Sequence, residues 1–288
     1  MRSIDRRRID DAIRGLAPLS NTAASILEQL EARSCSLADL REIIECDAPL
    51  TLRVLRMANV SAHALAERVE TVDRAVAVIG ERALVSVALA SGASSLLSVP
   101  LEGYRLSGDQ LLTGSLHGAV AARLLAVQVP GVAPTHAFTA GLLRDVGKVV
   151  MSALLAKRMP RSMSSFGALR STPASDFLES ERQLIGMDHC EVGYLVADHY
   201  GLSAAQHEVI AHHHRPSIAS PEHQEIVDVV HVADLVAMMV GGAGGVDEMQ
   251  YRFDHGAVMR LGLDPARLES LIVETLVEAE SLLEMLRA

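Results

Sequence analysis

Apolar residues recur at helical spacings along most of the chain. Ile26 and Leu30 lie four residues apart, and Leu40, Ile43 and Ile44 continue at spacings of three and four. This period places apolar side chains on one face of a helix. Alternating strand patterns flanked by Asn-Gly or Asp-Gly are absent from the sequence. The pattern therefore predicts an all-α protein of about a dozen helices or slightly more.

Polar residues and glycines mark where these helices begin and end. A residue with a short polar side chain favours the position before a helix, and Gln or Glu three residues later completes a capping box. Glycine is typical after the last turn. Starts are predicted at Ser36, Asp47 before Pro49, Ser107 with Gln110, Asp188 with Glu191, Ser203 with Gln206, and Asp264 before Pro265, and stops at Gly80, Gly201 and Gly241–Gly245.

The distribution of histidine divides the chain into two parts. Eleven of the twelve histidines lie after residue 106, whereas the first part has short amphipathic helices and His63. The segment 94–104, with Ser, Pro and Gly, is the expected joint. We therefore predict an N-terminal helical subdomain over residues 1–105, packed on a second helical subdomain over residues 106–288.

Composition excludes several classes of protein. The 26 Lys and Arg against 36 Asp and Glu give a net charge of −10, aromatic residues make up 3%, and Trp is absent. Such a chain lacks the basic surface and stacking residues of a nucleic-acid binder. Three widely spaced cysteines (Cys35, Cys46 and Cys190) form no disulfide framework or CxxC zinc knuckle and suit a reducing cytoplasm. The most apolar stretch, 83–99, is broken by serines, and the charged N-terminus has no apolar core of a signal peptide. We therefore expect a cytoplasmic protein that binds neither nucleic acid nor membrane.

Several histidines and one aspartate fall on apolar helix faces. His117 shares a face with Val120 and Leu124, and His189 lies in the first turn of the helix predicted to begin after Asp188. His213 and His214 close another helix, and Asp234 lies among apolar residues of a third. A buried histidine needs a polar partner, and a satisfied core residue is its ordinary role. The spacing alone names no function.

The residues AGLLRDVGK at 140–148 resemble the signature AGLLHDIGK of the HD superfamily of metal-dependent phosphohydrolases. More specifically, the chain is similar to the HDOD family (HD-related output domain) of bacterial signalling proteins. Further segments fit that family in the right order over roughly residues 12–240: Leu16–Ser20, Ile43–Asn59, Val72–Gly80, Gly186–Gly193 and His213–Pro216.

The resemblance implies a set of metal-ligand positions. Carried over to this chain, they are His117, Arg144, Asp145, His189, His213, His214 and Asp234. In active members, histidine and aspartate at these positions hold divalent metals that activate water against a phosphoester. Here the HD pair is Arg144-Asp145, and arginine has no lone pair to donate to a metal. This departure weighs against hydrolysis, although Asp234 keeps the ligand type of active enzymes.

Arg144 has two interpretations. In the first it is a charge substitute that pairs with Asp145 and Asp234, which have lost their metal. In the second it is an anion receptor that binds a phosphate-bearing ligand together with the neighbouring histidines, and Lys148 can add to either. Gly141 and Gly147 are expected to allow close helix packing around the site.

The resemblance thus favours a non-catalytic bacterial signalling or regulatory module with a degenerate HD pocket that acts through protein–protein contacts. HDOD modules are often joined to receiver, cyclase or phosphodiesterase domains in one chain, and we recognise none here. We therefore expect signalling partners recruited in trans and no cofactor. The alternative is a phosphohydrolase or phosphodiesterase acting on a nucleotide or cyclic dinucleotide, with Fe, Mn, Zn or Mg bound by His117, Asp145, His189, His213, His214 and Asp234. A third interpretation is a sensor that binds a phosphorylated small ligand without turnover.

Overall fold

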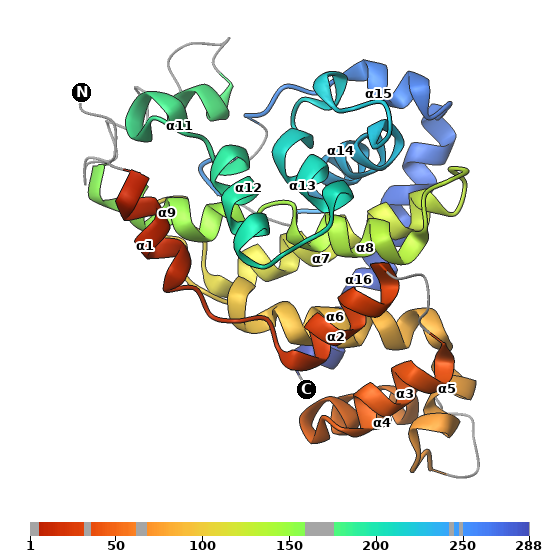
Figure 1. The fold of residues 1–288 in the computed structure, drawn as a ribbon. Coiled ribbons are helices and arrows are strands. Elements are labelled where there is room, and N and C mark those ends of the chain that lie inside the picture. The colour runs from red at the N-terminus through yellow and green to blue at the C-terminus, as the bar shows by residue number, and fades with distance from the viewer. Residues whose placement is uncertain are drawn as a thin grey trace. The chain divides into compact units, whose positions relative to one another are not determined.

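In the computed structural model, every named element of the described residues is a helix. The described residues are 6–31, 36–61, 68–158, 176–241, 245–247 and 250–287. The elements are α1 (Arg6–Arg14), α2 (Asn21–Glu31), α3 (Leu37–Glu45), α4 (Ala48–Ser61), α5 (Val72–Ile79), α6 (Glu81–Leu97), α7 (Gly108–Ala126), α8 (Pro134–Leu143), α9 (Gly147–Arg158), α11 (Phe177–Ile185), α12 (His189–His199), α13 (Ala204–His212), the 3₁₀ helix η1 (Pro216–Ile218), α14 (Gln224–Met239), α15 (His255–Arg260) and α16 (Pro265–Arg287). Figure 1 shows their course. The prediction of an all-α fold is confirmed.

The chain forms two compact units whose ranges differ from the predicted ones. The large unit holds Met1–Ala17 and Leu96–Leu276, and the small unit holds Pro18–Ser95 and Val277–Ala288. We predicted a boundary between residues 105 and 106. The N-terminus joins the large unit because α1 packs on α12 and α9 through the buried Ile9 and Ile13. Residues 96–105 join it because Tyr104 is buried there and its hydroxyl donates a hydrogen bond to Glu181.

The small unit is built around close contacts of α2, α4, α5 and α6. The backbone N–H of Ser20 donates to the carbonyl of Gly92, 3.2 Å away. A side chain at position 92 would lie 2.2 Å from Cβ of Ala23, so the approach of α6 to α2 requires glycine. Asn59 ties the end of α4 to the chain before α5, because its side chain bonds both backbone groups of Val69 at 2.8 Å.

The core of the large unit lies among α7, α8 and α14. α7 contacts both α8 and α14, and buried Ala, Leu and Val side chains fill the contact. α12 packs on α9 and on α13, which in turn contacts α14 (Figure 1). The HD-like motif and the candidate histidines all belong to this unit.

The predicted helix starts are largely those of the structure. Capping boxes form at Ser107 and Asp188, as predicted, and a further one forms at Ser36, where only a helix start was predicted. The capping box predicted at Ser203 is wrong, although the helix does begin there: the Ser203 side chain makes no capping bond. Its partner Gln206 is buried, so its side chain does not turn back to the Ser203 backbone.

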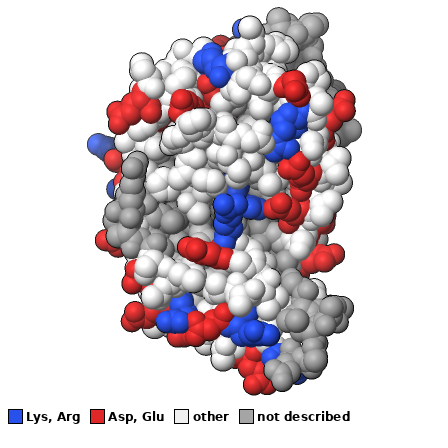
Figure 2. All heavy atoms as spheres, turned by 90° about the vertical axis from the view of Figure 1, so that its right-hand side faces the viewer, with Lys and Arg blue, Asp and Glu red and all other residues white. Residues whose placement is uncertain are grey.

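Among the described residues, no single helix combines the length and hydropathy that crossing a membrane requires. α5 and α6 pass this test only together, and the chain bends by 112° between them. On the face drawn in Figure 2, Lys and Arg side chains alternate with Asp and Glu and form no continuous basic patch. Cys46 is exposed and Cys190 buried, both as free thiols, whereas Cys35 lies outside the described residues.

Candidate functional site

The HD-like motif forms the turn between α8 and α9, directly against α12. A Cβ at Gly147 would lie 1.9 Å from the carbonyl oxygen of His189 and 2.6 Å from the backbone nitrogen of Gly193. A Cβ at Gly141 would lie 2.8 Å from the carbonyl oxygen of Gly118 on α7. Both glycines therefore allow the motif to pack closely on the backbone of a neighbouring helix, as predicted. The contact at Gly147 brings the motif next to the first turn of α12.

Arg144 follows the last residue of α8 and is almost completely buried, with 3% of its surface exposed. Its Nε donates to Oδ1 of Asp234 at 2.7 Å, Nη1 to the carbonyl of Gly141 at 2.7 Å, and Nη2 to the carbonyl of Gly114 at 3.2 Å. Oδ2 of Asp145 lies 3.4 Å from Nε. Every guanidinium nitrogen thus has a partner within the protein. Burial alone would lower the pKa of Arg144, but the two carboxylates raise it.

The guanidinium of Arg144 lies directly against Gly118 of α7. A Cβ at position 118 would be 2.2 Å from Nη1 and 2.6 Å from Cζ of Arg144. The adjacent residue, His117, is buried in the same helix. The side chain of Arg144 therefore fills a space that exists only because residue 118 has no side chain.

Lys148, in the first turn of α9, forms ion pairs with two carboxylates. Its Nζ lies 2.9 Å from Oδ1 of Asp145 and 2.8 Å from Oδ2 of Asp247, and it faces the rings of Tyr104 and Tyr251. Burial raises the pKa of the Asp145 carboxyl, but Lys148 and Arg144 outweigh it and hold that pKa well below its usual value. Asp145 therefore stays charged, held between two cations.

The histidines lie on the other side of Asp145. Nε2 of His189 is 3.5 Å and Nε2 of His213 is 3.8 Å from Oδ1 of Asp145. Nδ1 of His189 is 2.8 Å from the fully buried carboxylate of Glu181, which also accepts from the backbone N–H of His189. The ring of His214 stacks on Tyr251, with centroids 3.8 Å apart, and its Nδ1 is 3.7 Å from Asp234.

Cys190, the residue after His189, lies among these rings. Its Sγ is 3.6 Å from Nε2 of His189 and 3.9 Å from Nδ1 of His213. Burial raises the pKa of the Cys190 thiol, but the two histidines lower it below its usual value. Burial opposes a charge on His213, yet Cys190 and Asp145 raise its pKa to about 9. His214 differs, because burial and the neighbouring His213 and His189 hold its pKa well below the ordinary value.

The structure brings together seven of the eight residues singled out in the sequence: Arg144, Asp145, Lys148, His189, His213, His214 and Asp234. His117 lies beside Gly118, which Arg144 covers. Sequence reasoning missed Cys190, Glu181 and Asp247. Adjacency to His189 was a signal for Cys190, whereas Glu181 and Asp247 come from helix α11 and from a loop that carries no motif.

The residues present do not fit the hydrolytic metal centre that the family resemblance implies. Arg144 stands at a ligand position and cannot coordinate a metal. Its Nε also engages Asp234, and Asp145 is held by Arg144 and Lys148 together. A metal between these carboxylates would have to displace a guanidinium that makes three hydrogen bonds to the protein.

Comparison with known proteins places this fold and motif in a family. The family model of the HDOD domain matches residues 16–216. The chain belongs to the HDOD family. No curated protein matches it.

Solved structures share the fold of this HDOD chain at low sequence identity. An HDOD domain protein of unknown function from Geobacter sulfurreducens is 21% identical with a TM-score of 0.72, over 96% of this chain and 97% of the other. A protein from Marinobacter aquaeolei VT8, provisionally described as a signal transduction protein, is 21% identical with a TM-score of 0.74, over 98% of this chain and 66% of the other. A protein from Shewanella amazonensis SB2B, provisionally described as a phosphohydrolase, is 22% identical with a TM-score of 0.65, over 97% of both chains.

Proposed function

We propose that this HDOD protein is a catalytically inactive bacterial signalling module that acts by binding other proteins. The observation that carries the proposal is Arg144, whose guanidinium bonds Asp234 where active HD enzymes use histidine to hold a metal. The family match and the fold shared with a provisional signal transduction protein support a regulatory role. In this role, the buried polar cluster stabilises the large unit, and the surface supplies the contacts.

Of the two interpretations of Arg144, the contacts favour the first, in which its charge replaces that of a metal beside Asp145 and Asp234. A receptor for phosphate needs exposed donors, but Arg144 is 3% exposed and each of its nitrogens already has an acceptor. Lys148 is likewise buried between Asp145 and Asp247. An anionic ligand would have to break these ion pairs before it gained any contact.

The competing function is hydrolysis of a phosphodiester. It is favoured by Asp234, which keeps the ligand type of active enzymes, and by the fold shared with a provisional phosphohydrolase. It requires a metal at Asp145 and Asp234, which Arg144 opposes by its charge as well as by its hydrogen bonds.

We further propose that the module lies in the cytoplasm and that its partners are separate signalling proteins. The free thiols of Cys46 and Cys190 agree with a reducing compartment. The net charge of −10 favours partners with basic surfaces.

The test is an assay of the purified full chain with bis(4-nitrophenyl) phosphate and with a cyclic dinucleotide, each with added Mn²⁺. We expect the wild type to hydrolyse no more substrate than the Asp145→Ala variant, because neither has a competent metal centre. Turnover by the wild type that disappears in Asp145→Ala would establish the hydrolase instead.

A further inference from the structure

We propose that His189, Cys190, His213 and His214 form a closed site for one soft divalent metal, of which Zn²⁺ is the best match. One ligand atom from each of these four residues can be chosen so that all lie within 4.8 Å of one another. The site differs from the family's hydrolytic centre, because it adds a thiolate and needs neither Arg144, Asp145 nor Asp234.

The spacing of the four side chains suits tetrahedral coordination. Zinc binds thiolate sulfur at about 2.3 Å and imidazole nitrogen at about 2.0 Å, which puts sulfur and nitrogen ligands roughly 3.5 Å apart in a tetrahedron. Sγ of Cys190 is 3.6 Å from Nε2 of His189. Nδ1 of His213 lies 3.2 Å from the backbone carbonyl oxygens of Val209 and Ile210, so Nε2 is the nitrogen that His213 can offer to a metal. The rings of His213 and His214 have centroids 4.1 Å apart. The four ligand atoms, which lie within 4.8 Å of one another, would have to approach one another by up to about 1 Å to bind a single zinc ion.

Two ligand atoms of the cluster are buried without a hydrogen-bond partner. Nε2 of His213 and Nε2 of His214 make none in the described structure, and both residues are buried, with 0% and 5% of their surfaces exposed. A buried polar atom without a partner costs free energy, so such atoms are rare in folded proteins. Metal coordination would use both lone pairs.

Neighbouring residues hold the histidines in place, as the surroundings of a metal site do. Nδ1 of His189 is bonded to the Glu181 carboxylate, which leaves Nε2 facing Cys190. A carboxylate on the far nitrogen is the usual support of a metal-binding histidine. The ring of His231 bonds the carbonyl of His213 at 2.6 Å, and Tyr251 stacks on His214.

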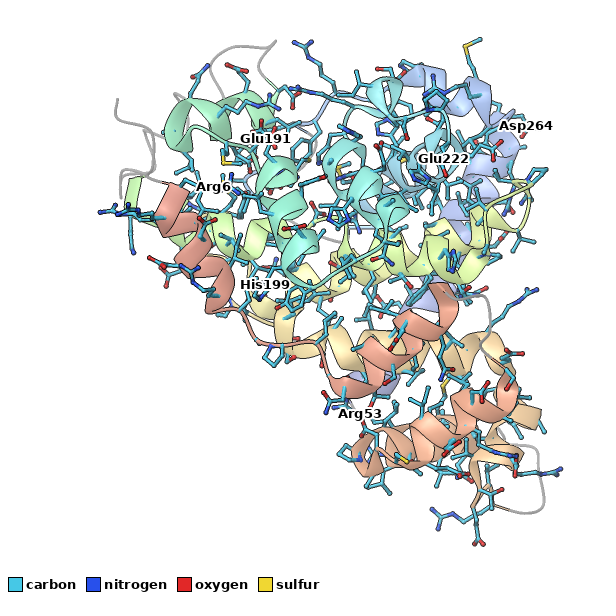
Figure 3. The ribbon with its side chains drawn as sticks, in the orientation of Figure 1. Arg6, Arg53, Glu191, His199, Glu222 and Asp264 are labelled. Carbon is cyan, nitrogen blue, oxygen red and sulfur yellow. The ribbon has the colours of Figure 1, made fainter. Side chains whose placement is uncertain are left out.

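A cavity of about 450 Å³ borders the cluster at Cys190. Cys190 lines it together with the carboxylates of Asp188 and Glu191 at the start of α12. Glu191, labelled in Figure 3, lies in the first turn of that helix. Arg182 and Arg215 line the same cavity, and Arg182 pairs with both carboxylates, so a metal ion would approach Cys190 past side chains of both charges.

The ligand set also determines what the metal does. Four protein ligands leave no open position for water, which is the mark of a structural zinc site and not of a catalytic one. Thiolate and imidazole select Zn²⁺ or Co²⁺ over Mg²⁺ and Mn²⁺. The site is thus compatible with a catalytically inactive module, but it departs from our expectation from the sequence that the protein has no cofactor.

The experiment uses the full chain, stripped with a chelator and titrated with Co²⁺ under reducing conditions. We expect one Co²⁺ per chain, with the visible bands of tetrahedral cobalt and a thiolate-to-cobalt charge-transfer band in the near ultraviolet. Zn²⁺ should abolish these bands by displacement, whereas Mn²⁺ in excess should not. Bound Zn²⁺ should also raise the melting temperature, because it binds the native state.

Cobalt spectra of variants show which side chains bind the metal. Cys190→Ser should lose the charge-transfer band, whereas the double variant Cys35→Ser, Cys46→Ser, whose only thiol is Cys190, should keep it. Glu181→Gln should weaken cobalt binding about 10- to 100-fold without removing the band. Because Cys190→Ser can be destabilised, His214→Gln is the second variant, and loss of the tetrahedral visible bands is expected while its charge-transfer band persists.

Two results would overturn the proposal: absence of cobalt bands in the wild type, or a charge-transfer band that survives in folded Cys190→Ser. The outcome is independent of the proposed function, because hydrolysis with Mn²⁺ would refute the inactive module without producing a cobalt–thiolate band.

Discussion

The two sides of the buried cluster differ in the partners that their buried polar groups have. On the carboxylate side, Asp145, Asp234 and Asp247 are each paired with Arg144 or Lys148 at 2.7–3.4 Å. On the histidine side, Nε2 of His213 and Nε2 of His214 have no hydrogen-bond partner in the described structure. Each carboxylate thus has a cation at ion-pair distance, although Oδ1 of Asp145, like the two histidine nitrogens, makes no hydrogen bond in the described structure. The histidine nitrogens have no such cation and can offer their lone pairs.

The difference shows what one substitution does to a metal centre. An arginine at a ligand position supplies permanent charge, so the adjacent carboxylates remain buried and ionised without a metal. The histidines lie beyond its reach, since Arg144 contacts Asp145, Asp234 and the backbone of Gly114 and Gly141. Loss of the hydrolytic centre and retention of metal-binding side chains are therefore compatible in one cluster.

The largest effect is expected from Arg144→Ala. Removal of the guanidinium leaves Asp234 and Asp145 buried with too little positive charge, and breaking a buried pair costs about 3–5 kcal/mol. Urea unfolding should show this loss in the free energy of unfolding. Arg14→Ala is the control, since Arg14 pairs with Asp11 on the surface, where both side chains are about two-thirds exposed, and should change stability little. Equal effects of the two variants would show that Arg144 does not balance buried charge.

The sequence predicted much of this cluster but not all of it. The helical period and polar caps predicted the all-α fold, because both follow from local spacing. Pairing of Arg144 with Asp145 and Asp234 was one of two predicted roles, and it follows from charge and burial. Cys190 and Glu181 escaped prediction because their role depends on helices α11, α12 and the end of α13 meeting, which no local pattern encodes.

Gly118→Ala tests whether the Arg144 guanidinium fills the space next to α7. The loss in the free energy of unfolding that this substitution causes should depend on Arg144. A Cβ at position 118 would lie 2.2 Å from the guanidinium, and overpacking of this kind costs about 1–3 kcal/mol. In the Arg144→Ala background the space is free, so the same change should cost much less. Unfolding of the two single variants and the double variant forms the cycle. Additive costs would mean that Arg144 does not occupy this space in solution.

The smallest effect is expected from Arg144→His in the presence of Mn²⁺. An imidazole at position 144 restores the missing ligand next to Asp145, so metal binding to the native state should stabilise the variant. At a free Mn²⁺ concentration ten times Kd, the gain is about 1.4 kcal/mol. Thermal melting of wild type and variant, with and without Mn²⁺, measures it. A wild type stabilised as much as the variant would show that Arg144 does not exclude the metal.

The central claim is that Arg144, and not a metal, balances the charge of Asp145 and Asp234. The most direct measurement is a crystal structure of the wild-type protein soaked in Mn²⁺, with anomalous data. We expect no anomalous peak on Asp145 or Asp234, and we expect Nε of Arg144 within hydrogen-bond distance of Oδ1 of Asp234. A manganese ion bound by both carboxylates, with the guanidinium displaced, would contradict it.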